Sequence, residues 1–136
     1  MPLSIDDVRQ ARDRISPHIH CTPVMKSSQI NRLLGCEIFF KADNLQKVGA
    51  FKARGACNAV FSMDSSELER GVVTHSSGNH GAALAWAAAL CNAPCTVVMP
   101  ENAPQAKKDA VASYGATVQF CKATMAAREA SVADII

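Results

Sequence analysis

Several features that would place the chain in a common class of proteins are absent from its 136 residues. The six cysteines form no Cys-x-x-Cys pair, and no Asn-x-Ser/Thr glycosylation site occurs. The first residues, Met-Pro-Leu-Ser-Ile-Asp-Asp, are acidic and do not resemble a basic and apolar signal sequence. We therefore expect reduced thiols, most of them in the core, and a cytoplasmic location.

Strong charge and long apolar runs are also lacking. Lys and Arg total 14 against 12 for Asp and Glu, and a net charge of +2 does not indicate a nucleic-acid or membrane partner. The longest apolar run, 82–91, has about half of the roughly 20 residues that span a bilayer. With 49% apolar and 19% charged residues, the composition is typical of a soluble domain with a core of its own.

Short apolar segments alternate with helical ones from residue 51 onward. We expect helices at 51–63, 79–90, 104–114 and from 124 to the end, and strands at 71–74, 95–99 and 117–121. This alternation predicts right-handed βαβ units and an α/β fold, in which a parallel sheet is flanked by helices on both faces. Such sheets bind ligands at the carboxyl ends of their strands, where the following helices begin.

The first 50 residues predict two helices and one strand. Ser4 is placed to cap the first helix, and Ser27 or Ser28 to cap a short second one that ends before Gly35. Segment 36–41 has the composition of a buried strand. The apolar stripe expected along the first helix is Ile5, Val8, Ala11, Ile15 and Ile19.

Lys52 is a candidate nucleophile. It follows a small-residue turn and Phe51, and it stands where a helix begins. The potential of the helix start and the neighbouring ring would both disfavour the ammonium form and so activate the amine. The alternative is a solvated lysine in the first helical turn, and the pattern around this residue alone does not exclude that.

The loop Ser76-Ser-Gly-Asn-His-Gly81 is a candidate anion site. Two glycines allow close approach of the backbone, and the free N–H groups of the first helical turn attract a carboxylate or a phosphate. Ser76, Ser77 and Asn79 add side-chain donors. The alternative is a serine-capped helix after a tight turn. No GxGxxG or Walker sequence occurs, which argues against the common nucleotide folds.

The histidines indicate no metal site. His18, His20 and Cys21 match no standard ligand spacing. His75 and His80 flank the loop, and each is interpreted first as a structural hydrogen-bond partner.

Taken together, these motifs resemble the fold type II pyridoxal-phosphate (PLP) enzymes, in particular the serine racemase and serine/threonine dehydratase group. The matching segments lie in the expected order and cover nearly the whole chain. They are Phe39-Phe-Lys-Ala-Asp-Asn-Leu-Gln-Lys47, Gly49-Ala-Phe-Lys52-x-Arg-Gly-Ala56, Ser76-Ser-Gly-Asn-His-Gly81 and Ser113-Tyr-Gly-Ala116. The resemblance implies a tryptophan-synthase-β-like fold that is incomplete here, with 1–47 in the large domain and 48–136 forming the small domain.

The resemblance also assigns roles to residues. Lys52 would form the internal aldimine with PLP, Phe51 would lie beside the pyridine ring, and Asn79 would hydrogen-bond the phenolic oxygen. Ser76, Ser77, Asn79 and His80 would bind the substrate carboxylate. Ser77 is similar to the serine that moves a proton on the second face in serine racemases, whereas threonine dehydratases commonly carry a small apolar residue there. Dehydration of L-serine to pyruvate and ammonia is an expected companion activity.

Family members are homodimers activated by divalent cations such as Mg²⁺ or Ca²⁺ and, in some branches, by ATP bound between subunits. The positions that match the nucleotide site are Ser27, Ser28, Lys47 and Tyr114. No metal ligands are assigned in this chain. Val48 and Ala82 stand where ATP-responsive relatives have more polar residues, which argues against nucleotide control.

A complete family member is more than twice as long, and we expect the glycine-rich loop for the PLP phosphate to lie beyond Ile136. Two hypotheses therefore stand. In the first, the chain is part of a serine racemase acting on L-serine, L-threonine or aspartate, and a threonine dehydratase is a further alternative. Otherwise it is a catalytically silent short form that works as a binding or dimerisation module.

Overall fold

The structure is a computed structural model that describes residues 2–136. The strands are β1 Val24–Met25, β2 Phe40–Lys41, β3 Val72–Thr74, β4 Cys95–Pro100 and β5 Thr117–Cys121. The α-helices are α1 Ile5–Ile15, α2 Ser28–Leu34, α3 Lys52–Phe61, α4 Ser65–Arg70, α5 Asn79–Leu90, α6 Gln105–Ser113 and α7 Met125–Ala133. Two short 3₁₀ helices, η1 Asp43–Leu45 and η2 Lys47–Gly49, precede α3. None of the helices described is long and apolar enough to cross a membrane.

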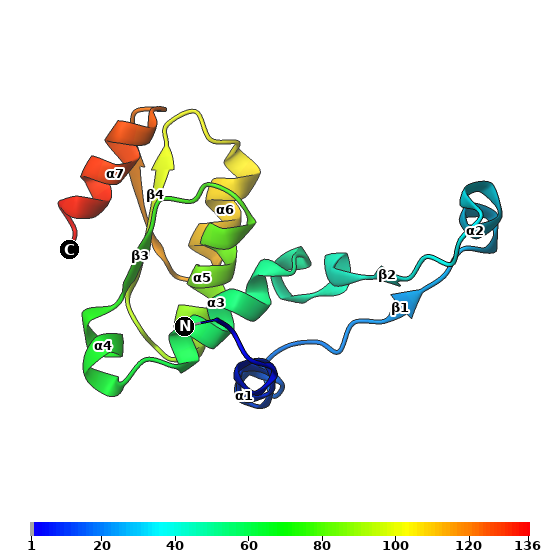
Figure 1. Cartoon of the computed structure of the whole chain (residues 1–136). Coiled ribbons are helices and arrows are strands. Elements are labelled where there is room, and N and C mark those ends of the chain that lie inside the picture. The colour runs from blue at the N-terminus through cyan, green and yellow to red at the C-terminus, as the bar shows by residue number, and fades with distance from the viewer. Residues whose placement is uncertain (1) are drawn as a thin grey trace.

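The centre of the molecule is a parallel sheet with the strand order β3-β4-β5. Val72 of β3 pairs with Cys95 of β4, and Thr96 of β4 pairs with Thr117 of β5. Helix α7 lies on one face of this sheet, and α3, α5 and α6 lie on the other (Figure 1). The α/β architecture predicted from the alternation of segments is thus confirmed, and the middle strand β4 is its most deeply buried element.

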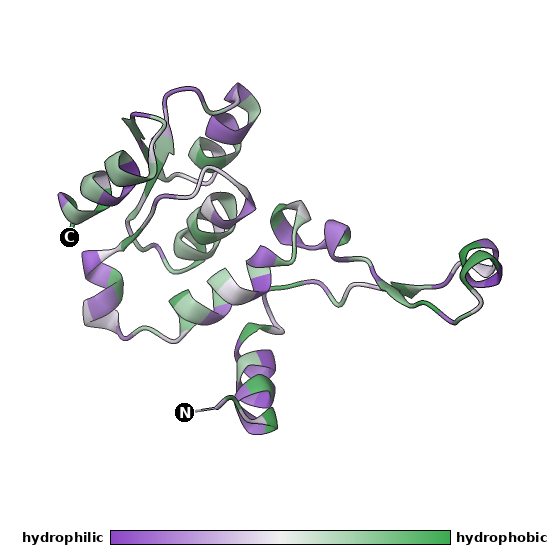
Figure 2. Cartoon of the chain, turned by 45° about the horizontal axis from the view of Figure 1, so that its top comes forward, coloured by the Kyte–Doolittle hydropathy of each residue, from purple (hydrophilic) through white to green (hydrophobic). Residues whose placement is uncertain are grey.

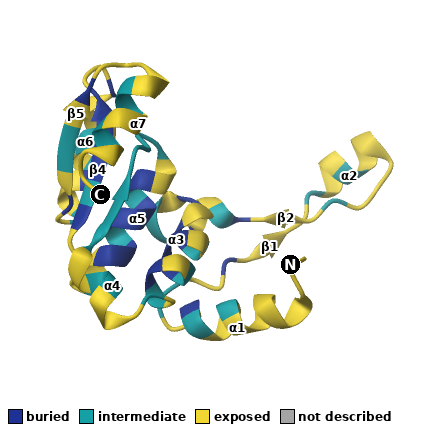
Figure 3. Cartoon of the chain, turned by 60° about the vertical axis from the view of Figure 1, so that its left-hand side comes forward, coloured by how far each residue is buried: buried dark blue, intermediate teal, exposed yellow. Residues whose placement is uncertain are grey.

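Helices α3 and α5 pack against each other through small side chains. The buried face of α3 consists of Ala53, Ala56, Cys57 and Val60. Along α5 the buried positions are Gly81, Ala83, Leu84, Ala85, Ala87 and Ala88, and Figure 3 shows dark blue, buried stretches on both helices. Because alanine and glycine let helix axes approach closely, the helix that begins with Lys52 lies directly against the helix that begins with Asn79.

An arm projects from the body and consists of β1, α2 and β2, that is, residues 24–41. Its two strands are antiparallel, with Val24 opposite Lys41, and α2 forms its tip (Figure 1). Apolar residues along this arm are coloured green in Figure 2, where the arm again stands clear of the body. Those most exposed are Val24, Met25, Leu33, Leu34, Phe39 and Phe40.

The predicted buried strand at 36–41 is therefore wrong. Only Phe40 and Lys41 pair with another strand, and Phe39 is 57% exposed. An apolar run is buried only where a second layer faces it, and no element within residues 2–136 covers the arm. The composition of this segment indicated burial, but none of the described elements packs on it.

The ends of the chain also correct two expectations. Ser4 caps α1 in a capping box with Asp7, as predicted, but only Ile15 of the expected stripe is buried, whereas Ile5 is 62% exposed. The last helix ends at Ala133 instead of continuing to Ile136.

The cysteines follow the expectation only in part. All six are free, with Cys57, Cys95 and Cys121 buried. Cys21 and Cys36 are exposed, so the prediction of core thiols holds for half of them. Burial raises the pKa of the Cys57 and Cys95 thiols to about 11, which keeps them protonated and unreactive near neutral pH.

Candidate active site

Lys52 is the first residue of α3, and a strained turn leads into it. Val48 has a φ of 55° and Gly49 a φ of 66°. The left-handed region suits glycine but is unfavourable for a β-branched residue, and strain of this kind persists only where the surrounding structure holds it in place. Because η2 packs on α5, the turn places Lys52 beside the helix that carries the candidate anion loop.

The side chain of Lys52 is exposed, with Phe51 beside it. The Nζ atom lies 4.9 Å from the centroid of the Phe51 ring, a distance at which an ammonium group is attracted by the ring face. Phe51 is itself 60% exposed. The ring therefore lies beside the amine, but the expected shielding of the amine from solvent is not observed, because both side chains are exposed.

An ion pair holds α3 behind Lys52. Arg54 donates from Nε to Asp43 Oδ2 at 3.0 Å and from NH2 to Asp43 Oδ1 at 2.9 Å. Thr22 completes the group, because its hydroxyl donates to Asp43 at 2.6 Å and accepts from Arg54 at 3.2 Å. The Arg54 guanidinium holds the pKa of the Asp43 carboxyl far below its usual range. This contact ties the helix of Lys52 to the residues that enter and leave the arm.

The loop between β3 and α5 forms a tight turn. The Ser76 hydroxyl accepts from the Gly78 N–H at 3.4 Å, and α5 begins at Asn79 without a side-chain cap. A Cβ atom at Gly81 would overlap the Ser76 carbonyl oxygen and approach Val97 Cγ1 to 3.1 Å. Glycine is therefore required for this packing, and the uncapped start of α5 leaves backbone N–H groups available to an anion.

Asn79 has a partner that the sequence did not reveal. Lys107 of α6 donates from Nζ to Asn79 Oδ1 at 3.0 Å. The contact joins residues 28 positions apart, so no local pattern could indicate it. Its amide nitrogen remains available as a donor, because a lysine can pair only with the oxygen.

The structure groups some of the predicted site residues and separates others. Ser76, Ser77, Asn79 and His80 lie together on the turn into α5. Among the positions matched to a nucleotide site, Ser27 caps α2 through the Ile30 N–H, and Ser28 begins that helix at the tip of the arm. Lys47 lies in η2 and Tyr114 follows α6 in the body. A single chain thus does not bring these four residues together (Figure 1).

Two histidines outside the candidate loop, His18 and His20, make structural contacts. The His18 ring packs on Phe61, with 4.1 Å between ring centroids, and His20 Nδ1 lies 3.0 Å from the Leu45 carbonyl oxygen. Among the described residues no three His, Cys, Asp or Glu side chains gather as metal ligands do.

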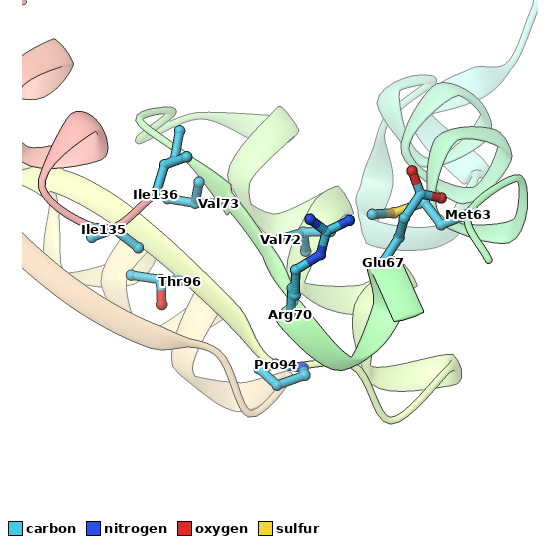
Figure 4. Close-up of a pocket in the computed structure, with 10 residues that line it drawn as sticks. Met63, Glu67, Arg70, Val72, Val73, Pro94, Thr96, Ile135 and Ile136 are labelled. Carbon is cyan, nitrogen blue, oxygen red and sulfur yellow. The ribbon is translucent and has the colours of Figure 1, made fainter. Parts of the chain in front are cut away.

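A cavity of about 300 Å³ lies away from these residues. It borders the starts of β3 and β4, where Val72 and Pro94 contribute to its wall, and Ile136 closes one side (Figure 4). The candidate loop is at the opposite ends of these strands, so the cavity is not the place where Lys52 and Asn79 act. Parallel α/β sheets use the carboxyl ends of their strands for chemistry.

Local sequence patterns do not single out two further residues, Arg54 and Arg128. Arg54 belongs to the lysine motif, and its position two residues after Lys52 is the one sequence signal of a supporting role. Arg128 of α7 has a buried Nε atom with no hydrogen-bond partner among the described residues. Nothing in the pattern around Arg128 distinguished it from a surface arginine.

The fold and these residues together define an α/β protein with an exposed lysine at the start of one helix and an anion-attracting turn at the start of the next. The family model described as "Pyridoxal-phosphate dependent enzyme" matches residues 15–136, and the chain belongs to this family. Its fold is that of the fold type II members, as the resemblance predicted.

Individual relatives show which members of this family the chain is similar to. Serine racemase of Dictyostelium discoideum is 53% identical over 98% of the chain, which covers 41% of that protein. A beta-hydroxyaspartate dehydratase of Paracoccus denitrificans is 48% identical over 96% of the chain and is likewise covered to 41%. The structure of maize serine racemase matches 99% of the chain with a TM-score of 0.96 and 44% identity, the chain covering 41% of it. The chain thus spans about two fifths of the length of these relatives.

The residues present fit the ring end of PLP. The exposed amine of Lys52 is suited to its aldehyde, and the free amide nitrogen of Asn79 is suited to its phenolic oxygen. The phosphate end has no glycine-rich loop in this sequence, since the glycines are dispersed along it. The residues present therefore fit one end of PLP and not its phosphate.

Proposed function

We propose that the chain carries the lysine and the proton-transfer residues of a PLP-dependent serine racemase that also dehydrates L-serine. The observation that carries this proposal is the packing of α3 on α5, which sets the helix of Lys52 against the helix that follows Ser77. The serine racemases among the relatives support this choice within the family.

Each residue then has a defined task. The bound cofactor supplies the electron sink that makes the α-proton of an amino acid acidic. Lys52 takes up or returns this proton on one face, and the Ser77 hydroxyl does so on the other. Two donors on opposite faces allow inversion, whereas Lys52 alone allows only exchange and loss of the β-hydroxyl.

The turn into α5 would hold the substrate carboxylate. Ser76, Asn79 and His80 contribute side chains, and the uncapped helix start contributes backbone N–H groups. L-serine is the proposed substrate. L-threonine and aspartate are secondary candidates, and the relative named for beta-hydroxyaspartate supports a site that tolerates a further group at Cβ.

Assembly and regulation follow from the same proposal. The active form would be a cytoplasmic homodimer, with residues 1–47 in a large domain and 48–136 as the small domain. Activation by Mg²⁺ or Ca²⁺ would use ligands outside this chain, which has none assigned. Binding of ATP at Ser27, Ser28, Lys47 and Tyr114 would require a partner subunit, because one chain does not bring these four residues together, and Val48 and Ala82 argue against such control.

The exposed arm favours a second candidate function. An apolar surface of this extent on residues 24–41 is typical of a segment that binds protein. A catalytically silent chain that joins a longer homologous subunit through this arm is therefore the alternative.

A chimaera tests the proposed function. The chain replaces the matching segment of the Dictyostelium relative, to which it is 53% identical, and the product is assayed for D-serine and for pyruvate from L-serine. We expect both products from the chimaera and neither from its Lys52→Ala variant. A folded, PLP-loaded chimaera without either activity would contradict the proposal and favour the binding module.

The Ser77→Ala variant of the chimaera tests the second face. We expect racemisation to fall by roughly 100-fold or more, because a positioned acid or base contributes that much, while pyruvate formation persists. Ser62→Ala is the control, since Ser62 lies at the end of α3 and its hydroxyl donates only to the Ala59 carbonyl. Equal loss of both products, or of neither, would contradict the role of Ser77.

A further inference from the structure

We propose that Lys107 is a positioning residue for the cofactor: it holds the Asn79 side-chain amide with its nitrogen turned toward the phenolic oxygen of PLP. The inference rests on the proposed contact of Asn79 with PLP. It begins from the hydrogen bond that Lys107 Nζ donates to Asn79 Oδ1 at 3.0 Å.

The chemistry of an amide explains why a lysine is suited to this task. One end of the Asn79 side chain accepts and the other donates, and the two orientations of the group have nearly the same shape. An ammonium group only donates, so its contact with Oδ1 selects one orientation. The amide nitrogen is then the free end, and a phenolate oxygen requires such a donor.

The described surroundings of Lys107 offer its ammonium group no ion pair that would compete with Asn79. Lys107 is the third residue of α6 and Asn79 is the first of α5, and these helices pack against each other. None of the ion pairs among the described residues involves Lys107. Asp109, the carboxylate two residues along the same helix, accepts instead from Gln105 Nε2 at 2.8 Å.

Lys108 provides a matched control. Its Nζ donates to the Glu101 carbonyl at 2.7 Å and lies 5.0 Å from the Phe120 ring centroid. Lys108 therefore contacts the residue that follows β4 and has no hydrogen bond to Asn79. Replacement of either lysine by methionine removes one positive charge and keeps an unbranched side chain that is one atom shorter. A difference between the two variants therefore reports the contact and not the net charge.

The test measures PLP binding to the 136-residue chain by absorbance titration. We expect Lys107→Met to raise the dissociation constant roughly 3- to 10-fold, the range of one ordinary hydrogen bond, because the contact is exposed to solvent. Lys108→Met should stay within about two-fold of the unsubstituted chain, and Lys107→Arg should restore most of the binding, because arginine also only donates.

A second readout is independent of the cofactor. The side-chain amide signals of Asn79 in the ¹⁵N NMR spectrum are assigned by their loss in Asn79→Ala. We expect these signals to shift in Lys107→Met and not in Lys108→Met, in protein without PLP.

The outcomes separate this inference from the proposed function. If the unsubstituted chain binds PLP but both methionine variants bind equally well, or are weakened equally, the inference is wrong and the proposed function stands. Unchanged Asn79 signals in Lys107→Met also contradict it. If the unsubstituted chain captures no PLP, the assigned role of Lys52 in this chain fails and the inference fails with it.

Discussion

At the scale of residues, the contact between Arg54 and Asp43 joins α3, the helix that begins with Lys52, to η1. Two parallel hydrogen bonds between a guanidinium and a carboxylate hold both groups in one plane. The side chains are only 29% and 20% exposed, so solvent screens the pair less than it screens the pairs on α1. The pair joins residues 11 positions apart at the place where the arm meets the body.

Replacing Arg54 by methionine should lower the free energy of unfolding by about 1.5–3 kcal/mol, the range for hydrogen bonds to charged groups. Arg9→Met is the matched control, because the Arg9–Asp6 pair is 62% and 72% exposed and such pairs contribute little. Urea unfolding at neutral pH measures the free energy of unfolding of both variants. An Arg54 variant no less stable than the Arg9 variant would contradict the supporting role.

The same pair predicts a dependence on pH. The folded state lowers the pKa of Asp43, chiefly through the hydrogen bond from Arg54. Its stabilisation is therefore fully present above the unfolded value of about 3.9 and is lost as the pH falls below it toward the folded value. We expect the stability difference between the unsubstituted chain and Asp43→Asn to shrink as the pH falls from about 6 to about 3. A difference that stayed constant over this range would exclude Asp43 as its source.

At the scale of elements, helices α3 and α5 each contain a glycine, and the two glycines differ in whether the packing leaves room for a side chain. Gly55 of α3 has open space around the position of a Cβ atom, whereas at Gly81 of α5 a Cβ atom would overlap the Ser76 carbonyl oxygen. Glycine inside a helix is unfavourable relative to alanine unless packing requires it. Gly81 is thus part of the site, while Gly55 is not required by the packing described.

Alanine substitutions at these two positions should have opposite effects. Gly55→Ala is expected to stabilise the chain by about 0.5–1 kcal/mol. Gly81→Ala is expected to destabilise it by about 1–3 kcal/mol, as overpacking does, and to displace the loop of Ser76 and Ser77. Thermal unfolding of both variants measures the difference. Similar effects of the two substitutions would contradict the geometry of the loop.

Local patterns were sufficient to predict most elements of the body. The start of α5 and the bounds of β5 agree with the sequence because glycine, small residues and short apolar runs act over a few positions. The sequence-based prediction omitted helix α4, although Asp64 and Glu67 form its capping box, a pattern that indicates the start of a helix. The contacts that shape the site, Arg54 with Asp43 and Lys107 with Asn79, join residues far apart, and no local pattern reveals such pairs.

At the scale of the whole molecule, the body and the arm differ in how much apolar surface they cover. The body buries most of its middle strand and one side of its alanine-rich helix, whereas the arm exposes Leu33 at 82% and Phe39 at 57% (Figure 3). The sequence predicted burial for the second half of this arm. That prediction fails for the single chain, because burial depends on a facing layer and not on composition alone.

The arm should therefore make the chain associate. We expect the purified chain to form dimers or larger species in light scattering behind a sizing column, and the double variant Leu33→Ser, Phe39→Ser to shift it toward the monomer. Leu3→Ser is the control, since Leu3 is 88% exposed outside the arm. A monomeric unsubstituted chain at every concentration tested would exclude the arm as a self-association surface.

The central claim is that Lys52 differs from every other exposed lysine of the chain in its reaction with PLP. The most direct test incubates the purified chain with a small excess of PLP, fixes the lysine–PLP bond by borohydride reduction and locates the label by peptide mass spectrometry. The account predicts label concentrated on Lys52, with its loss in Lys52→Ala and no such effect in Lys108→Ala. Label spread evenly over the exposed lysines, and unchanged in total when Lys52 is replaced, would contradict it.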